Sequence, residues 1–183
     1  LYIEVCCEAG GRSQTAVIAG SHTHFITDEE KEMLSQDSSS STVAAQPSPI
    51  QLTMQMVYEF AMTAPLSEIC FILEARDLNM RAAELSVKGN YGHCLGKTID
   101  RPLSHGIFGN SIFSHIISKT ASACDARMGG AMIPVMSNSG SGNQGICATN
   151  PVAVFATENE NTEEELIRAL ILSHLTAIYI KQS

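Results

Sequence analysis

A glycine- and serine-rich run from Met128 to Gly145 constrains this chain more than any other segment. Between Gly129 and Gly145 it holds five glycines, three serines, two asparagines and a glutamine, yet it encloses the apolar stretch 131–136. A surface linker would gain nothing from that apolar stretch, and a core segment would rarely tolerate so many small polar residues beside it. The combination predicts a binding loop held against a packed interior, where glycines allow positive φ and free N–H and hydroxyl groups meet an oxyanion.

The 183 residues divide into three stretches of different composition. Residues 1–34 begin with strand-like alternation around a turn at Gly10 and Gly11, which predicts a small antiparallel β-meander followed by a short charged helix. Residues 35–49 are rich in serine, glutamine, alanine and proline, a composition typical of an extended linker or mobile loop. Residues 50–183 carry the period of helices and include the loop. We therefore expect an α+β chain in which a small antiparallel sheet precedes a mostly helical part.

Apolar spacing and breakers place the helices of residues 50–183. Residues 90–102 contain two glycines and a proline and are expected to be irregular, and a long, weakly polar helix follows over 104–126. Residues 147–156 are typical of a buried helix, and Thr162 with Glu165 forms a capping-box pattern before the last helix. The first helix is expected to turn one apolar face inward, made of Ile50, Met54, Val57, Tyr58 and Ala61.

Charge and hydropathy exclude two classes of partner. The net charge is −8 and the basic residues are scattered singly, whereas nucleic-acid binders carry basic stripes. No apolar run reaches the roughly 18–20 residues that cross a bilayer, so no membrane partner is expected. Charged residues make up only 16% of the chain, against roughly 25% on average. We therefore expect it to bury surface against missing N- and C-terminal parts of its own polypeptide or against another subunit, as in a homodimer.

The six cysteines show no CxxC spacing and no paired framework. This pattern is typical of reduced, mostly buried thiols in a cytoplasmic protein. His174 lies in the middle of an apolar helical stripe and is interpreted as a hydrogen-bonded core histidine. No residue of the chain is assigned as a metal ligand.

Candidate substrate-binding groups gather in the polar half of the loop and directly before it. Arg127 could pair a substrate carboxylate bidentately, and an ion pair with Asp125 is an equal alternative. The loop is not a P-loop, because no Lys-Ser or Lys-Thr follows its glycines, and a purely structural glycine loop is the competing interpretation. The other candidates are the hydroxyl and amide side chains of Ser137, Asn138, Ser139, Ser141, Asn143 and Gln144.

The 22 residues from Asp125 to Ile146 resemble the signature of the serine dehydratase α-chain-like family, which includes the L-cysteine desulfidases. Residues 170–181 resemble the helix that follows this loop in the family. Residues 1–5 and 21–24 resemble its central sheet. The resemblance therefore runs over nearly the whole chain.

This resemblance implies a cytoplasmic lyase that uses a [4Fe-4S] cluster for β-elimination. Loss of hydrogen sulfide from L-cysteine, or of water from L-serine, would leave pyruvate and ammonia. In the family the cluster cysteines lie in regions that this chain does not contain, so we expect a central fragment that binds the amino-acid substrate and is inactive alone. Two other functions stay open: a non-catalytic module that binds an amino acid or anion, and a degenerate member with only a structural role.

Overall fold

The computed structural model of the chain describes residues 2–19, 25–27, 50–101 and 109–182. They belong to two compact units, Leu1–Ile50 and Gln51–Ser183. The short charged helix and the linker expected at 28–49 lie outside the described residues.

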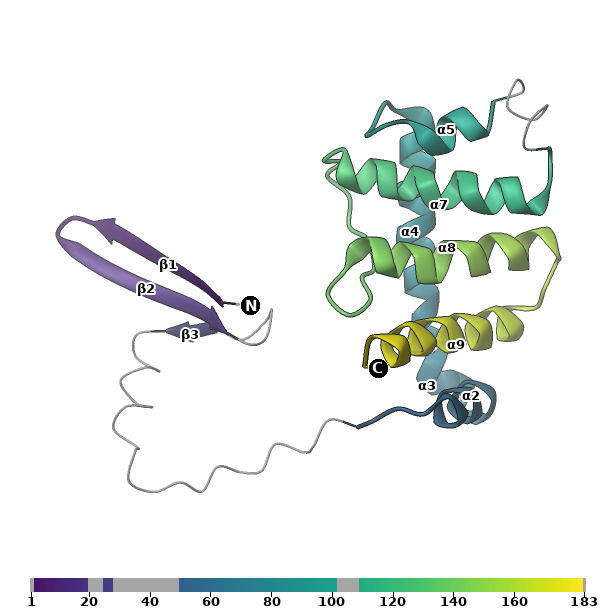
Figure 1. Ribbon diagram of the computed structural model, residues 1–183, viewed down its shortest axis with the longest axis horizontal. Coiled ribbons are helices and arrows are strands. Elements are labelled where there is room, and N and C mark those ends of the chain that lie inside the picture. Colours follow the sequence, from purple (N-terminus) through teal and green to yellow (C-terminus); the bar gives the residue numbers. More distant parts are fainter. Residues whose placement is uncertain (1, 20–24, 28–49, 102–108, 183) are drawn as a thin grey trace. The chain divides into compact units, whose positions relative to one another are not determined.

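The first unit is a three-stranded antiparallel sheet in the order β1-β2-β3 (Figure 1). Its strands are β1 (Tyr2–Ala9), β2 (Arg12–Ala19) and β3 (Phe25–Thr27). The turn between β1 and β2 has positive φ at both Gly10 (58°) and Gly11 (78°), the type I′ geometry that glycine adopts without a steric penalty. The predicted antiparallel meander is confirmed.

The second unit is helical. Figure 1 shows α5, α7, α8 and α9 lying side by side across α4, with α2 against α9, and each of these neighbouring pairs is in contact. No single described helix is long and apolar enough to span a membrane, although the bent pair of α2 and α3–α4 meets that criterion by length and composition. The predicted α+β class is confirmed. The elements are α2 (Met54–Thr63), α3 (Leu66–Ile69), the 3-10 helix η1 (Cys70–Ile72), α4 (Leu73–Lys88), α5 (Leu95–Ile99), α7 (Ile112–Met128), α8 (Gly142–Glu158) and α9 (Glu163–Gln182).

Two buried clusters hold the helices together. The larger cluster joins α2, α3, η1, the first turn of α4, the end of α8 and the first half of α9, with most of its bulk from leucine and isoleucine side chains. The smaller consists of Ala82, Ala83, Ala123, Ala126 and Ile146, at the contact of α4, α7 and α8. Alanine lets these three helices approach closely, because only a methyl group separates their backbones.

The last helix begins as its capping box predicts. The backbone N–H of Thr162 donates to Glu165 Oε2 at 2.8 Å, and the N–H of Glu165 donates to Thr162 Oγ1 at 3.3 Å. The bond from the Thr162 backbone, with others from Asn161 and the Thr162 hydroxyl, holds the pKa of the Glu165 carboxyl below its ordinary value. The apolar side of α9 then enters the core at Leu166 and Leu170.

Three helix boundaries differ from the sequence prediction. The segment 90–102, expected to be irregular, contains the short helix α5. Of the helix expected over 104–126, residues 104–108 lie outside the described residues, and α7 begins at Ile112, where Ser111 and Ser114 cap each other reciprocally. Helix α8 begins at Gly142, inside the predicted loop, because the Ser141 side chain caps its first turn.

The predicted inward face of the first helix is only partly correct. Val57 and Ala61 are buried, whereas Met54 and Tyr58 are 42% and 55% exposed and Ile50 is also exposed. Helix α2 packs mainly against α9, so α9 covers only a narrow strip of α2. This strip contains Val57 and Ala61, which lie one helical turn apart.

The prediction of mostly buried thiols is wrong for this chain taken alone. Cys94 and Cys124 are half-buried, and the other four cysteines are exposed, although all six are free. Cys70 and Cys147 are exposed because they lie on the solvent-facing sides of η1 and α8.

Candidate functional site

The segment between α7 and α8 ends in a tight turn at the centre of the predicted binding loop. Asn138 and Ser141 exchange backbone hydrogen bonds of 3.0 and 2.9 Å. The two residues between them, Ser139 and Gly140, have φ of 49° and 78°, which makes this a type I′ turn. A positive φ at serine is uncommon, so the surrounding contacts must hold the turn in this form. Its tip, Ser139 and Gly140, is exposed.

Asn138 points inward and anchors the turn. Its side-chain Nδ2 donates to the backbone carbonyl of His174 at 3.0 Å, which fixes the orientation of the amide. Its Oδ1 accepts from Ser139 Oγ and Gln144 Nε2, both at 3.0 Å. Asn138 therefore ties the loop to α9 and to the first turn of α8.

The hydrogen bonds around His174 specify one neutral tautomer of its ring. Asn138 Nδ2 lies 3.1 Å from His174 Nδ1, and because that amide nitrogen can only donate, Nδ1 must accept. His174 Nε2 then carries the proton and donates to Thr149 Oγ1 at 3.0 Å, while the Thr149 hydroxyl donates to the Gly145 carbonyl at 2.7 Å. Burial lowers the pKa of His174 below its ordinary value of 6.5, in agreement with this neutral form. The interpretation of His174 as a hydrogen-bonded core histidine is confirmed.

A second buried asparagine, Asn79 of α4, completes the support of the loop. Its Oδ1 accepts from the Met136 N–H at 2.9 Å, and its Nδ2 donates to the Met136 carbonyl at 3.3 Å and to Thr149 Oγ1 at 3.1 Å. Neither Asn79 nor Thr149 is among the site residues predicted from the sequence. A signal was present, because Asn79 lies on the same buried stripe of α4 as Ala75 and Ala82, where a polar side chain needs a partner.

Two glycines of the loop, Gly142 and Gly145, allow other residues to lie close against the first turn of α8. A Cβ at Gly145 would collide with the Met136 carbonyl oxygen and lie 2.8 Å from the Ser137 backbone. A Cβ at Gly142 would collide with the Arg127 guanidinium. A larger residue at Gly145 would therefore push α8 away from the backbone of 136–137, whereas one at Gly142 would displace the Arg127 side chain.

Arg127 lies over the N-terminus of α8. Its Nη1 donates to Asn143 Oδ1 and contacts Met128 Sδ, both at 3.2 Å, so its partners are neutral. Within the described residues, the backbone N–H groups of Gly142 and Asn143 have no protein acceptor. Gly142 is buried beneath the Arg127 side chain and Asn143 is half-buried, so the exposed guanidinium covers the positive end of the α8 dipole, which favours an anion at the guanidinium.

Asp125 has a different role from Arg127. Its carboxylate is buried and accepts from the backbone N–H groups of His93 at 3.1 Å and Gly96 at 3.3 Å. No ion pair joins it to Arg127 within the described part of the chain. The alternative of an internal Asp125–Arg127 ion pair is therefore not found, and the guanidinium is left at the surface.

The remaining predicted site residues surround the turn. Ser137 and Ser139 are exposed on the loop, and Lys181 of α9 donates to the Ser139 carbonyl at 2.6 Å. Ser141 caps α8 by accepting from the Gln144 N–H at 3.3 Å. The structure thus brings all seven predicted residues to one end of α8, with Asn138 and Ser141 in structural bonds and Arg127, Ser137 and Ser139 facing outward.

The described residues do not fit a [4Fe-4S] cluster. Such a cluster takes several thiolates from one site, and the described residues contain no group of three or more cysteine, histidine, aspartate or glutamate side chains able to hold a metal ion. Cys124 lies beside Cys147, and burial, together with Cys147, raises the pKa of the Cys124 thiol to about 11.

The chain resembles known proteins over most or all of its length. A family model described as serine dehydratase alpha chain matches residues 19–183. UPF0597 proteins of Bacteroides thetaiotaomicron and Bacteroides fragilis are 60% and 59% identical to it, covering 100% of this chain and 43% of each relative. A UPF0597 protein of Photobacterium profundum is 43% identical over 99% of this chain and 43% of the relative. No solved structure gives a significant match.

The chain therefore spans less than half the length of these relatives. The family match includes the whole turn, the start of α8 and every residue that supports them. The resemblance drawn from residues 125–146 is confirmed, and the chain belongs to the serine dehydratase alpha chain family.

Proposed function

We propose that this chain is the substrate-binding part of a cytoplasmic lyase that eliminates the β-substituent of L-cysteine or L-serine. The family match supports an amino-acid lyase in general. The observation that carries the binding role is the exposed Arg127 guanidinium, which lies over the N-terminus of α8. The substrates, the activity of the longer protein and a homodimeric state are part of the same proposal.

The substrate carboxylate would lie at this corner. Arg127 meets only neutral protein partners there, so its charge is available to a carboxylate in bidentate geometry. The half-buried Asn143 would supply a backbone N–H as a further donor, and the dipole of α8 would add to the attraction. The hydroxyl oxygens of Ser137 and Ser139, exposed on the adjoining turn, are placed to accept from the substrate ammonium group.

The network behind the turn would hold these groups in place. Asn138, His174, Thr149 and Asn79 form one buried chain of hydrogen bonds between α4, α8 and α9. A binding group needs such support because a small displacement weakens a bidentate contact. We place the ligands of the [4Fe-4S] cluster in parts of the longer protein beyond these residues, because the described residues offer no suitable set.

Two variants test the binding role in the longer protein, reconstituted anaerobically with iron and sulfide. Arg127→Lys keeps the charge but loses the planar fork, and Ser139→Ala removes one hydroxyl. We expect Arg127→Lys to raise KM for both amino acids by about tenfold or more. A tenfold increase corresponds to about 1.4 kcal/mol of binding free energy, which is the loss of one good polar contact. The measurement is the rate of pyruvate formation from L-cysteine and from L-serine.

A matched control is Ser67→Ala, because Ser67 is an exposed serine of α3 far along the chain from the loop. Unchanged kinetics in both Arg127→Lys and Ser139→Ala would refute the binding role. Amino-acid binding that depends on Arg127 without any pyruvate formation would instead support a non-catalytic binding module.

A further inference from the structure

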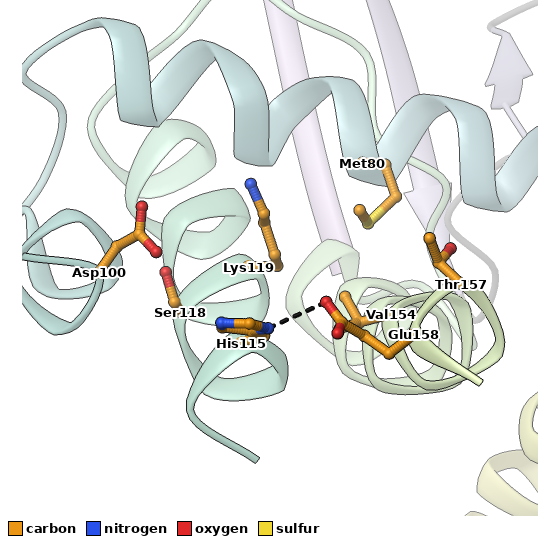
Figure 2. A pocket seen from close by; sticks show the side chains of 8 residues that line it. All are labelled: Met80, Asp100, His115, Ser118, Lys119, Val154, Thr157 and Glu158. Carbon is orange, nitrogen blue, oxygen red and sulfur yellow. Dashed lines mark hydrogen bonds and ion pairs between the residues drawn. The ribbon is translucent and has the colours of Figure 1, made fainter. Parts of the chain in front are cut away.

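A pocket with a mainly apolar lining and several charged side chains lies at the opposite end of α8 from the loop. Its volume is about 290 Å³, and it opens between α4, α7, α8 and the end of α5 (Figure 2). From Gly142 to Thr157 the helix rises by about 22 Å, so the two sites are well separated. Occupancy of this pocket therefore does not depend on the lyase activity proposed above.

The pocket contains one cation that is not neutralised by the protein. Lys119 of α7 is half-buried and lies between Asp100 and Met80 (Figure 2). Among the described residues no carboxylate lies within ion-pair distance of its ammonium group, and that group has no hydrogen-bond acceptor. Lys119 Nζ is not among the buried side-chain atoms that lack a partner, so this ammonium group reaches solvent and is available to an anionic group of a ligand.

Acceptors of the opposite sign line the rest of the pocket. Glu158 uses one carboxylate oxygen for His115 Nδ1, at 2.9 Å, and its second oxygen has no protein partner among the described residues. The carboxylate of Asp100 likewise makes no hydrogen bond or ion pair with a described residue, although the Asp100 backbone N–H donates to the Gly96 carbonyl at 3.2 Å. The His115 ring is not available, because its Nε2 contacts Asn110 Oδ1 at 2.8 Å.

The two hydroxyl groups of the pocket could only accept a hydrogen bond from a ligand, because each already donates its proton to a backbone carbonyl. Ser118 donates its proton to the Gly96 carbonyl and Thr157 donates to the Ala153 carbonyl, both at 2.9 Å. Met80 and Val154 supply the apolar part of the wall. The recognition chemistry of this pocket thus consists of one lysine, two carboxylates and a wall that is mainly apolar.

We propose that this pocket binds a small aliphatic zwitterion, with its carboxylate on Lys119 and its ammonium group between Asp100 and Glu158. A simple anion would face two carboxylates, and a simple cation would face the lysine. The volume is at the small end of the range for ligand pockets, roughly 300–1,000 Å³, so a nucleotide does not fit. The described residues contain no group of three or more side chains that could hold a metal ion.

The test uses the 183-residue chain with ¹³C-methyl-labelled methionine, because the methyl group of Met80 reports on the pocket. Glycine and 4-aminobutyrate are the zwitterionic probes, and acetate and methylammonium carry one charge each. We expect at least one zwitterion to shift the Met80 resonance saturably with a millimolar Kd, and the single-charge probes to bind about tenfold more weakly, a difference of about 1.4 kcal/mol. The resonance of Met132, which is fully exposed in the loop region, serves as the internal control.

Two variants decide the binding mode. Lys119→Gln should weaken zwitterion binding about tenfold or more, equivalent to about 1.4 kcal/mol, and Asp100→Asn, at an exposed residue, should weaken it without any effect on folding. Lys88→Gln removes the same charge at an exposed position outside the pocket and should leave binding unchanged. Saturable binding that survives Lys119→Gln, equal binding of acetate or methylammonium, or no shift by any probe would overturn the proposal. Ser139→Ala should not change the Met80 response, so failure here is distinct from failure of the loop.

Discussion

His174 is the residue at which protonation and packing are most closely coupled. Its Nδ1 accepts from Asn138 and its Nε2 donates to Thr149, so a second proton on Nδ1 would face the amide hydrogen of Asn138. Burial lowers its pKa below 6.5 in the folded chain. As pH falls below 6.5, the unfolded chain therefore binds the proton first, and folding stability decreases until the pH reaches the folded pKa.

We predict that above pH 6.5 His174 contributes no pH dependence to the free energy of unfolding. Below pH 6.5 the free energy of unfolding should fall on acidification. The measurement is urea denaturation at a series of pH values between neutral and mildly acidic. His174→Gln should be less stable at neutral pH but should show a flatter dependence in this window. His93→Gln, at an exposed histidine, is the control and should keep the slope of the unchanged chain. The same slope in His174→Gln would contradict the assignment.

At the scale of elements, the contact of α5 with α7 depends on the absence of a side chain at Gly96. A Cβ there would collide with Ser122 Oγ, the Ser122 backbone nitrogen and the Ser118 carbonyl oxygen. Two of these atoms belong to the backbone of α7 and cannot move aside without bending that helix. Helix α5 also depends on Asp125, whose carboxylate accepts from the Gly96 N–H.

We predict that Gly96→Ala destabilises the chain by about 1–3 kcal/mol, the usual cost of overpacking. Unfolding in urea measures the loss. Leu95→Ala, at the exposed neighbouring position, should change stability by no more than about 0.5 kcal/mol. If Gly96→Ala were as stable as Leu95→Ala, the close packing of α5 on α7 would be wrong.

The elements that the sequence predicts well are those with local signals. The capping box at Thr162, the glycine turn between β1 and β2 and the apolar stripe of α9 are all local patterns, and all three are confirmed. Helix α5 was missed because it has only five residues and is held by an aspartate from α7.

In the candidate site, too, the sequence predicts the features that have local signals and misses those that distant residues determine. The positions of the polar loop residues follow from composition, and all lie at one end of α8. The inward orientation of Asn138 does not follow from composition, because it is set by His174, 36 residues further along the chain. Asn79 was missed for the same reason, since its partner Met136 is 57 residues away.

At the scale of the whole molecule, helix α2 exposes more large apolar side chains than is usual for a helix at the surface of a monomeric protein. Met54, Met56, Tyr58, Phe60 and Met62 are all exposed, while Val57 and Ala61 are buried. A helix that is apolar on nearly every side is normally buried. We predict concentration-dependent self-association of the chain, measured by light scattering after size exclusion, and a shift toward monomer in Phe60→Ser. A chain that is monomeric at every concentration would contradict this.

The second unit should fold without the first. Both buried clusters and the entire hydrogen-bond network around His174 and Asn79 lie within residues 51–183. Deletion of residues 1–49 removes the sheet but no member of either cluster, so we predict that the free energy of unfolding of 50–183 differs from that of the longer chain by no more than about 0.5 kcal/mol. Urea denaturation followed by circular dichroism measures the difference.

Deletion of 163–182 is the opposite case, because α9 supplies Leu166, Ile167, Leu170 and Ile171 to the larger cluster. This deletion should abolish cooperative unfolding. Loss of cooperative unfolding in 50–183 itself would show that the sheet is part of the same folding unit.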